Sequence, residues 1–193
     1  MQTEKPITKL VNFKNKILLV VMAIMLSFPA ESAWGKTAQE IAASVSSCLG
    51  RFHNEVKGGK EMVAKAKGVL VMPRVVKASF IVGGEYGEGA LQVGDKTESY
   101  YSLASGSIGL QIGGQVKDFI ILFMTDEALK EFQDSNGWEV GVDGNVALVT
   151  IGVGERVDFT KINDPIIAFV FGVKGLMADI SLKGAKFTKI NPQ

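Results

Sequence analysis

The sequence predicts an α+β domain, in which a curved or barrel-like antiparallel sheet carries N-terminal amphipathic helices and one short inserted helix. Two observations lead to this class. Single and paired glycines interrupt apolar, β-branched runs between residues 67 and 124, and a glycine inside a strand marks a bulge, a bend or the close approach of another backbone. The strands also follow one another too closely for helical crossovers, so we expect them to pair antiparallel.

Two helices precede the strands. Thr37 and Glu40 have the spacing of a capping box, after which apolar residues recur at helical intervals as far as Val56. A glycine pair ends this helix, and residues 60–67 are predicted to form a shorter one. The apolar face of the first helix is expected to pack on the sheet, as such faces usually do.

Six short strands are predicted in the glycine-rich region, at residues 69–72, 80–82, 90–93, 99–103, 108–112 and 118–124. The stretch at 120–123 is apolar on both faces, which places it at the centre of the sheet. A short helix is then predicted from Thr125 or Asp126 through Asp134.

The last third of the chain is predicted to complete the sheet. Asp143 and Gly144 form a two-residue hairpin signal between strands at 138–141 and 145–153. Trp138 begins the first of these strands and is expected to be buried. The final pair of strands is predicted at 166–171 and 178–182.

Residues 1–35 have the layout of a secretory signal peptide. Four lysines precede an uncharged apolar stretch from 17 to 28, and small residues follow, ending in Ala33-Trp34-Gly35. The apolar stretch is shorter than the roughly 20 residues of a membrane-spanning helix. We therefore expect export to the periplasm or the exterior, with residues 36–193 as a single domain; an uncleaved membrane anchor is the alternative.

The charge of residues 36–193 is nearly balanced. Residues 1–35 hold four lysines and two glutamates, so 17 of the 21 basic residues and 18 of the 20 acidic residues remain, a net charge of −1. A nucleic-acid binder is expected to carry a basic excess. The composition therefore argues against nucleic acid as a partner.

The order of several sequence blocks resembles the SYLF family, also called the Ysc84 actin-binding domain. The blocks are Lys67-Gly-Val-Leu-Val-Met-Pro73, Val76-Lys77-Ala78, Gly83-Gly-Glu-Tyr-Gly-Glu-Gly89, Met124-Thr-Asp-Glu-Ala-Leu129, Gly137-Trp-Glu-Val-Gly-Val-Asp-Gly144 and Phe171-Gly-Val-Lys-Gly-Leu176. Met72 and Ser79 depart from the usual pattern, where Phe and Gly are common. The resemblance runs from about Thr37 to Ile190. It implies a non-enzymatic domain that binds phospholipid, phosphoinositides in eukaryotic members, some of which also bind actin; bacterial members resemble envelope proteins.

The residues themselves offer little for catalysis. His53 is the only histidine and Cys48 the only cysteine, and five residues apart on one helix they face different directions. We expect Cys48 to be a small core residue and His53 to lie on the surface or as a satisfied helix residue. No cofactor and no zinc site is expected, since structural zinc takes four ligands of these types.

Three carboxylates stand close together in the sequence, at Glu85, Glu88 and Asp95. A surface calcium site can be imagined there, because calcium accepts carboxylate oxygens from loops. No EF-hand spacing is present. An acidic, solvated hairpin is therefore the favoured interpretation, and calcium binding stays open.

A local basic cluster is the candidate binding site. It extends from the end of the first helix through the first strand and consists of Lys57, Lys60, Lys65, Lys67, Arg74 and Lys77. Basic side chains beside an amphipathic helix attract anionic lipid headgroups by about 1 kcal/mol per lysine. A solvated charged face explains the same pattern equally well. The resemblance favours phospholipid contact.

The leading hypothesis is thus a module that binds anionic phospholipid, or a membrane surface, in the bacterial envelope. An adaptor that binds another envelope protein is the alternative. An enzyme is the third possibility and the least favoured, for want of an acid, a base and a nucleophile that could act together.

Overall fold

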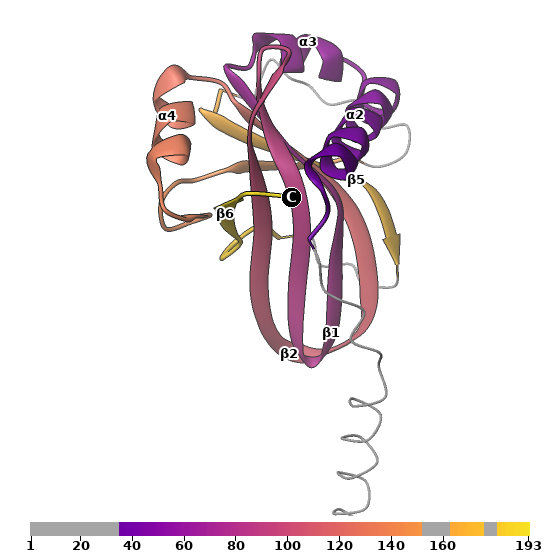
Figure 1. Cartoon of the computed structure of the whole chain (residues 1–193). Helices are drawn as coiled ribbons and strands as arrows, with labels where there is room; N and C mark the ends of the chain where they lie inside the picture. Colours follow the sequence, from indigo (N-terminus) through magenta and orange to yellow (C-terminus); the bar gives the residue numbers. More distant parts are fainter. Residues whose placement is uncertain (1–34, 152–162, 176–180) are drawn as a thin grey trace, which may run out of the picture. The chain divides into compact units, whose positions relative to one another are not determined.

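The computed structural model describes residues 35–151, 163–175 and 181–193, with side chains throughout except at 80–81 and 107–112. The elements, in chain order, are α2 (Ala38–Glu55), α3 (Gly59–Lys65), β1 (Gly68–Val93), β2 (Lys96–Phe123), α4 (Asp126–Asp134), β3 (Trp138–Glu139), β4 (Ala147–Thr150), β5 (Ile166–Gly175) and β6 (Lys186–Ile190) (Figure 1). Residues 1–34, nearly the whole predicted signal peptide, lie outside the described residues. None of the described helices is long and apolar enough to cross a membrane.

One long antiparallel hairpin, β1 with β2, dominates the domain. The strands hold 26 and 28 residues and pair from Gly68 with Phe123 to Val93 with Lys96. The prediction of six short strands was therefore wrong in its boundaries. Glycines do not end the strands, because backbone hydrogen bonding continues past them; three register shifts bend the ladder instead.

The hairpin curves until its far half packs on its near half, and the bend is visible at the lower end of Figure 1. A Cβ atom on Gly89 would lie 1.9 Å from the carbonyl oxygen of Val71, and one on Gly87 would lie 2.6 Å from Cγ2 of Val75. Only glycine permits such an approach at these two positions. The predicted curved sheet and close backbone approach are confirmed.

The sheet has the strand order β3-β6-β2-β5-β4, with β1 beside β2. All pairs are antiparallel, as predicted, except that β4 runs parallel to β5. The predicted Asp143-Gly144 hairpin was wrong, since β3 pairs with β6 and β4 with β5. The amide N–H of Glu139 donates to the Asp143 carboxylate at 2.7 Å, so this segment forms a local turn from which the chain crosses to another strand.

The final strand was also misplaced. We predicted 178–182, whereas the structure has Lys186–Ile190; residues 178–180 lie outside the described residues, and Ser181 and Leu182 precede a turn. Strand β6 is mostly polar and exposed, and only Phe187 is fully buried. Its partner is the central strand β2, with Leu103 opposite Phe187.

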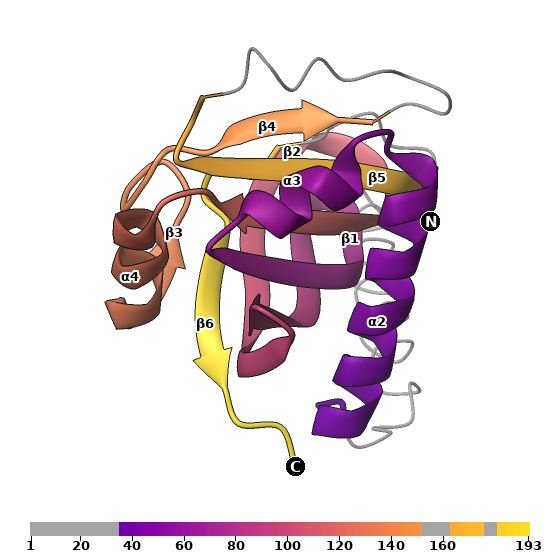
Figure 2. The ribbon, with the colours of Figure 1, turned by 90° about the horizontal axis from the view of Figure 1, so that it is seen from above.

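Side chains alternate across the sheet into two apolar layers. On one face, Val71, Ile120 and Phe169 pack with α2 and α3. On the other, Phe119 and Ile121 pack with α4, β3 and β6. Figures 1 and 2 place α2 and α4 on opposite sides of the sheet. The segment at 120–123, predicted to be central, is fully buried between β1 and β5.

The two predicted helix caps are confirmed. The capping box joins Thr37 and Glu40, and the Thr125 hydroxyl accepts from the amide of Ala128 at the start of α4. The apolar face of α2 is core, as expected, since its residues are almost wholly buried on the sheet. Trp138 is buried too, with its ring edge-to-face against Phe132 of α4 at 5.6 Å.

Candidate functional site

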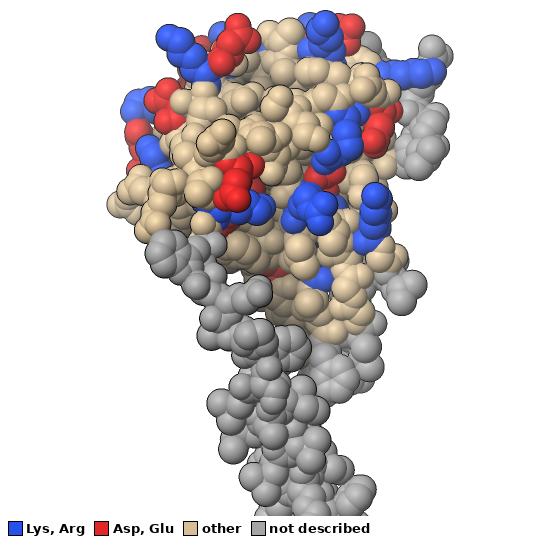
Figure 3. Space-filling model, turned by 45° about the vertical axis from the view of Figure 1, so that its right-hand side comes forward, with Lys and Arg blue, Asp and Glu red and all other residues tan. Residues whose placement is uncertain are grey.

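Four of the six predicted basic residues lie together at one corner of the domain. Lys57, Lys60, Lys65 and Lys67 are all exposed, between the end of α2 and the start of β1. Only Lys67 forms an ion pair in the part of the chain that the structure describes, with Asp126 at 3.4 Å. We call Lys57, Lys60 and Lys65 the α3 flank. Figure 3 shows one face of the molecule, on which basic and acidic side chains alternate without a single unbroken basic area.

Lys77 does not join the other predicted residues. Its relative exposure is 5%, because strand alternation places it on the same inward face as the fully buried Val75. It pairs with Gln115 across the ladder. Lys77 therefore cannot meet a flat membrane surface as the exposed lysines can.

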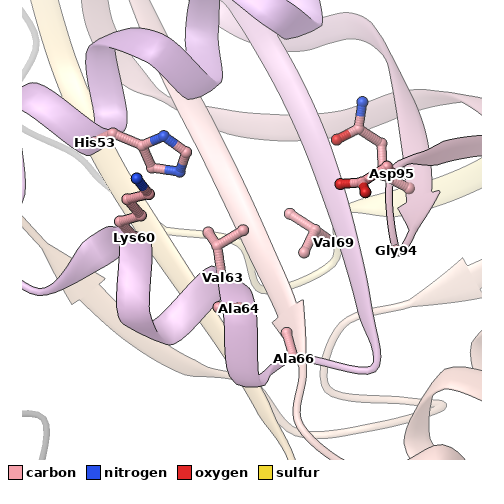
Figure 4. A pocket seen from close by; sticks show the side chains of 9 residues that line it. His53, Lys60, Val63, Ala64, Ala66, Val69, Gly94 and Asp95 are labelled. Atoms are coloured by element: carbon pink, nitrogen blue, oxygen red, sulfur yellow. The ribbon is translucent and has the colours of Figure 1, made fainter.

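A pocket opens beside the α3 flank, with a volume of about 320 Å³. Its floor is apolar and includes Val63 and Val69, while Lys60 and Asp95 stand at its polar edge. Figure 4 shows Lys60 reaching toward the imidazole of His53, with Asp95 on the far side of the pocket. An apolar floor with a cationic edge suits an amphiphilic ligand.

His53 is less satisfied than expected. Its Nε2 atom is buried and has no hydrogen-bond partner among the described residues, although the side chain as a whole is half-buried. The ring contacts Phe52, with centroids 6.3 Å apart. The imidazole thus lines the pocket while its Nε2 atom stays buried.

A second cationic group lies on the other side of α2. The Arg51 guanidinium contacts the Asp118 carboxylate at 2.7 Å and also donates to the Ser47 hydroxyl at 3.1 Å. The hydrogen bond with Asp118 raises the pKa of Arg51. The other Asp118 oxygen accepts from the backbone N–H of Arg74 at 2.8 Å. Asp118 therefore fixes two arginines that come from different elements.

Two bulges flank Asp118 on neighbouring strands. On β1 the register shifts between Met72 and Val75, and on β5 it shifts opposite residues 116–118. Arg74 sits in the first bulge with φ at 52°, the only non-glycine residue with positive φ among those described. Gly172 sits in the second at φ 61°, where a Cβ atom would lie 2.9 Å from the Asp118 carboxylate.

Arg74 in the first bulge and Lys174, two residues after Gly172, line one hollow of about 440 Å³. Arg51, Asp118 and Glu55 complete its polar lining. We call Arg51, Arg74 and Lys174 the bulge flank. Sequence reasoning found Arg74 but missed Arg51, Lys174 and Asp118. A carboxylate at the head of the apolar run 119–123 was the available signal.

The three predicted carboxylates do not form a solvated acidic hairpin. Glu85 is buried against Lys117, with the two charges 3.2 Å apart and side-chain exposures of 3% and 0%. Glu88 is buried as well, and accepts from the hydroxyl of Tyr86 and the amide of Lys36. Only Asp95 is exposed. Across the described residues, no three His, Cys, Asp or Glu side chains are grouped to hold a metal ion.

Cys48 lies in the core between the two flanks, as predicted. Burial raises the pKa of its thiol to about 12, and the nearby Asp118 carboxylate adds to the shift. Because the thiolate is the reactive form, the native thiol is inert at neutral pH.

The geometry defines an α+β domain with two separate cationic flanks, one on each side of its first helix. Residues 104–191 match the Ysc84 family model, described as Las17-binding protein actin regulator. This match confirms the resemblance to the SYLF family over residues 104–191.

Three mammalian proteins are similar over 129 residues, and each is named SH3 domain-containing YSC84-like protein 1. The protein from Pongo abelii is 27% identical, and those from Rattus norvegicus and Mus musculus are each 28% identical. The similarity covers 64% of this chain and 37% to 38% of the relatives. The chain thus matches little more than a third of the length of these relatives.

Proposed function

We propose that this domain is a non-enzymatic module that attaches to anionic phospholipid surfaces through the α3 flank. The observation that carries the proposal is the set of three exposed lysines, without ion pairs in the described part of the chain, beside a pocket with an apolar floor. The match of residues 104–191 to the Ysc84 family model supports a binding role. The signal-like sequence of residues 1–35 supports a location in the bacterial envelope.

The expected attachment is weak and reversible. Each lysine near an anionic bilayer contributes about 1 kcal/mol, so three give about 3 kcal/mol. One acyl chain alone gives only marginal attachment, and this electrostatic contribution is weaker still. The interaction is also screened by salt, because the Debye length is about 10 Å at 0.1 M.

Vesicle flotation tests the proposal. Wild-type protein is expected to float with phosphatidylglycerol vesicles and not with phosphatidylcholine vesicles, and added salt is expected to reduce flotation. The K57Q/K60Q/K65Q variant is expected to lose flotation. A matched variant, K130Q/K183Q/K189Q, removes three exposed lysines from other elements and is expected to float normally. Residues 1–35, if retained, act equally in both variants.

Equal flotation of wild type and the α3-flank variant would show that the three lysines are only solvated. If wild-type protein binds no vesicle, the adaptor alternative is favoured. That alternative rests on the description of the matched family as Las17-binding. It also rests on Val142 and Leu148, two exposed apolar residues around β4, the strand at one end of the described sheet.

A further inference from the structure

We propose that the bulge flank is a binding site for one phosphate monoester group. Arg51, Arg74 and Lys174 come from α2, β1 and β5, and all three line the same hollow. Cations brought together from three separate elements are not explained by local sequence, as a charged helix face would be. The site uses none of the α3-flank lysines, so it stands or falls independently of the proposed membrane contact.

Asp118 positions the site without neutralising it. Its two oxygens are taken by the Arg51 guanidinium at 2.7 Å and by the Arg74 backbone amide at 2.8 Å. Among the described residues, the Arg74 guanidinium and the Lys174 ammonium have no ion-pair partner. Two charged donors are therefore held beside the hollow and remain available to an anion.

The backbone is strained where the site is built. Arg74 has φ at 52°, a region that non-glycine residues avoid and that occurs preferentially at ligand sites. Bulges redirect side chains and are frequent beside functional sites. Here Arg74 lies in the bulge on β1, and Lys174 follows the bulge on β5, at the position paired with Val116.

The chemistry selects a single doubly charged oxyanion. A guanidinium offers a planar pair of donors that matches phosphate oxygens, and Lys174 adds a compact charge. A monoester phosphate presents three terminal oxygens and about two negative charges. The Arg74 guanidinium and the Lys174 ammonium can balance these charges, and the Arg51 guanidinium lies beside them. Glu55 and Asp118 also line the hollow, so its cationic excess over carboxylates is small, which disfavours polyanions.

The phosphate group could belong to a lipid headgroup or to a soluble compound. Titration with inorganic phosphate, followed by calorimetry, tests the shared chemistry on the full chain. Wild-type protein is expected to show saturable binding. Arg74→Gln is expected to weaken binding by about tenfold, or about 1.4 kcal/mol, and Lys174→Gln, which changes an exposed side chain, by several-fold.

The matched control is Lys130→Gln, and both it and K57Q/K60Q/K65Q are expected to bind phosphate as wild type does. The proposal would be overturned if wild-type protein showed no saturable binding. It would also be overturned if Lys174→Gln and Arg74→Gln both bound phosphate as tightly as the wild type. Flotation with phosphatidic acid vesicles identifies the source. A gain over phosphatidylglycerol that depends on Arg74 assigns the group to a lipid, whereas phosphate binding without this gain assigns it to a soluble compound; either supports the site.

Discussion

Arg51 and His53 are two residues apart on α2, about 200° around the helix, and they belong to two different surfaces. On the bulge flank, Arg51 is fixed by Asp118 and faces two strand bulges. On the α3 flank, the lysines stand in solvent beside a pocket that His53 lines. The comparison teaches that one flank is built by tertiary structure, whereas the other is a local concentration of charge.

The largest difference between the flanks should appear in stability. Asp118→Ala removes a charged hydrogen bond to Arg51 and leaves the Arg74 amide without its acceptor, which is expected to cost about 2 to 3 kcal/mol of unfolding free energy. Lys60→Ala is expected to change it by less than about 0.5 kcal/mol. Denaturant unfolding measures both variants. Equal stabilities of the two variants would mean that tertiary contacts stabilise the bulge flank no more than the α3 flank.

The reactivity of the Cys48 thiol measures how well the core beneath α2 is buried. Burial raises the pKa of its thiol to about 12, while an exposed thiol ionises near pH 8.5. Alkylation at pH 8 is therefore expected to be at least about 100-fold slower in the native protein than after unfolding.

Asp118 also influences the pKa of the Cys48 thiol, and this predicts how a substitution of Asp118 changes the rate of alkylation. The negative carboxylate raises the pKa of Cys48, so Asp118→Asn is expected to lower it and to accelerate alkylation. Lys60→Gln provides the control and is expected to leave the rate unchanged. A native rate that matches the unfolded rate would contradict the burial of this thiol.

A substitution of Arg74 distinguishes the effect of its backbone conformation on stability from the effect of its side chain on phosphate binding. Arg74→Gly relieves the positive φ, and is expected to leave stability unchanged or to raise it by up to about 1 kcal/mol. The same substitution is expected to weaken phosphate binding by about tenfold, as Arg74→Gln does, because the guanidinium is lost. Thermal unfolding and phosphate titration measure the two effects. A large loss of stability would show that Arg74 serves the fold instead.

The smallest effect is expected at Lys67, beside the α3 flank. Its ion pair with Asp126 joins two exposed side chains at 3.4 Å, and such pairs contribute about 0 to 1 kcal/mol. Lys67→Ala is therefore expected to cost less than about 0.5 kcal/mol in urea unfolding. A cost as large as that of Asp118→Ala would erase the contrast between the flanks.

The parts of the fold that could be predicted depend on local interactions. The caps at Thr37 and Thr125 and the helices after them follow from residues three or four apart. The parallel pairing of β4 with β5 could not be predicted, because the partners are twenty residues apart, as with Ala147 and Ile167. The lengths of β1 and β2 could not be predicted, because each apolar run between glycines and polar residues has the length of a separate strand.

The candidate site also contains residues that local sequence predicts and residues that only the tertiary structure brings together. Lys60 and Lys65 were predicted from their own neighbourhood and are exposed. Lys77 was predicted with them and is buried, which alternation with Val75 could have indicated. Arg51 and Lys174, in contrast, line one hollow because α2 packs on β5 through Phe52. No pattern within either segment predicts this arrangement.

Fluorescent labelling tests the central claim, membrane contact by the α3 flank, most directly. An environment-sensitive probe is attached to Lys60→Cys or, as a control, to Lys183→Cys, both exposed positions; native Cys48 stays unlabelled because its thiol is buried. On mixing with phosphatidylglycerol vesicles, the emission of the probe at position 60 is expected to shift to the blue and that at position 183 to remain unchanged. An unchanged spectrum at position 60 with a shift at position 183 would contradict the account.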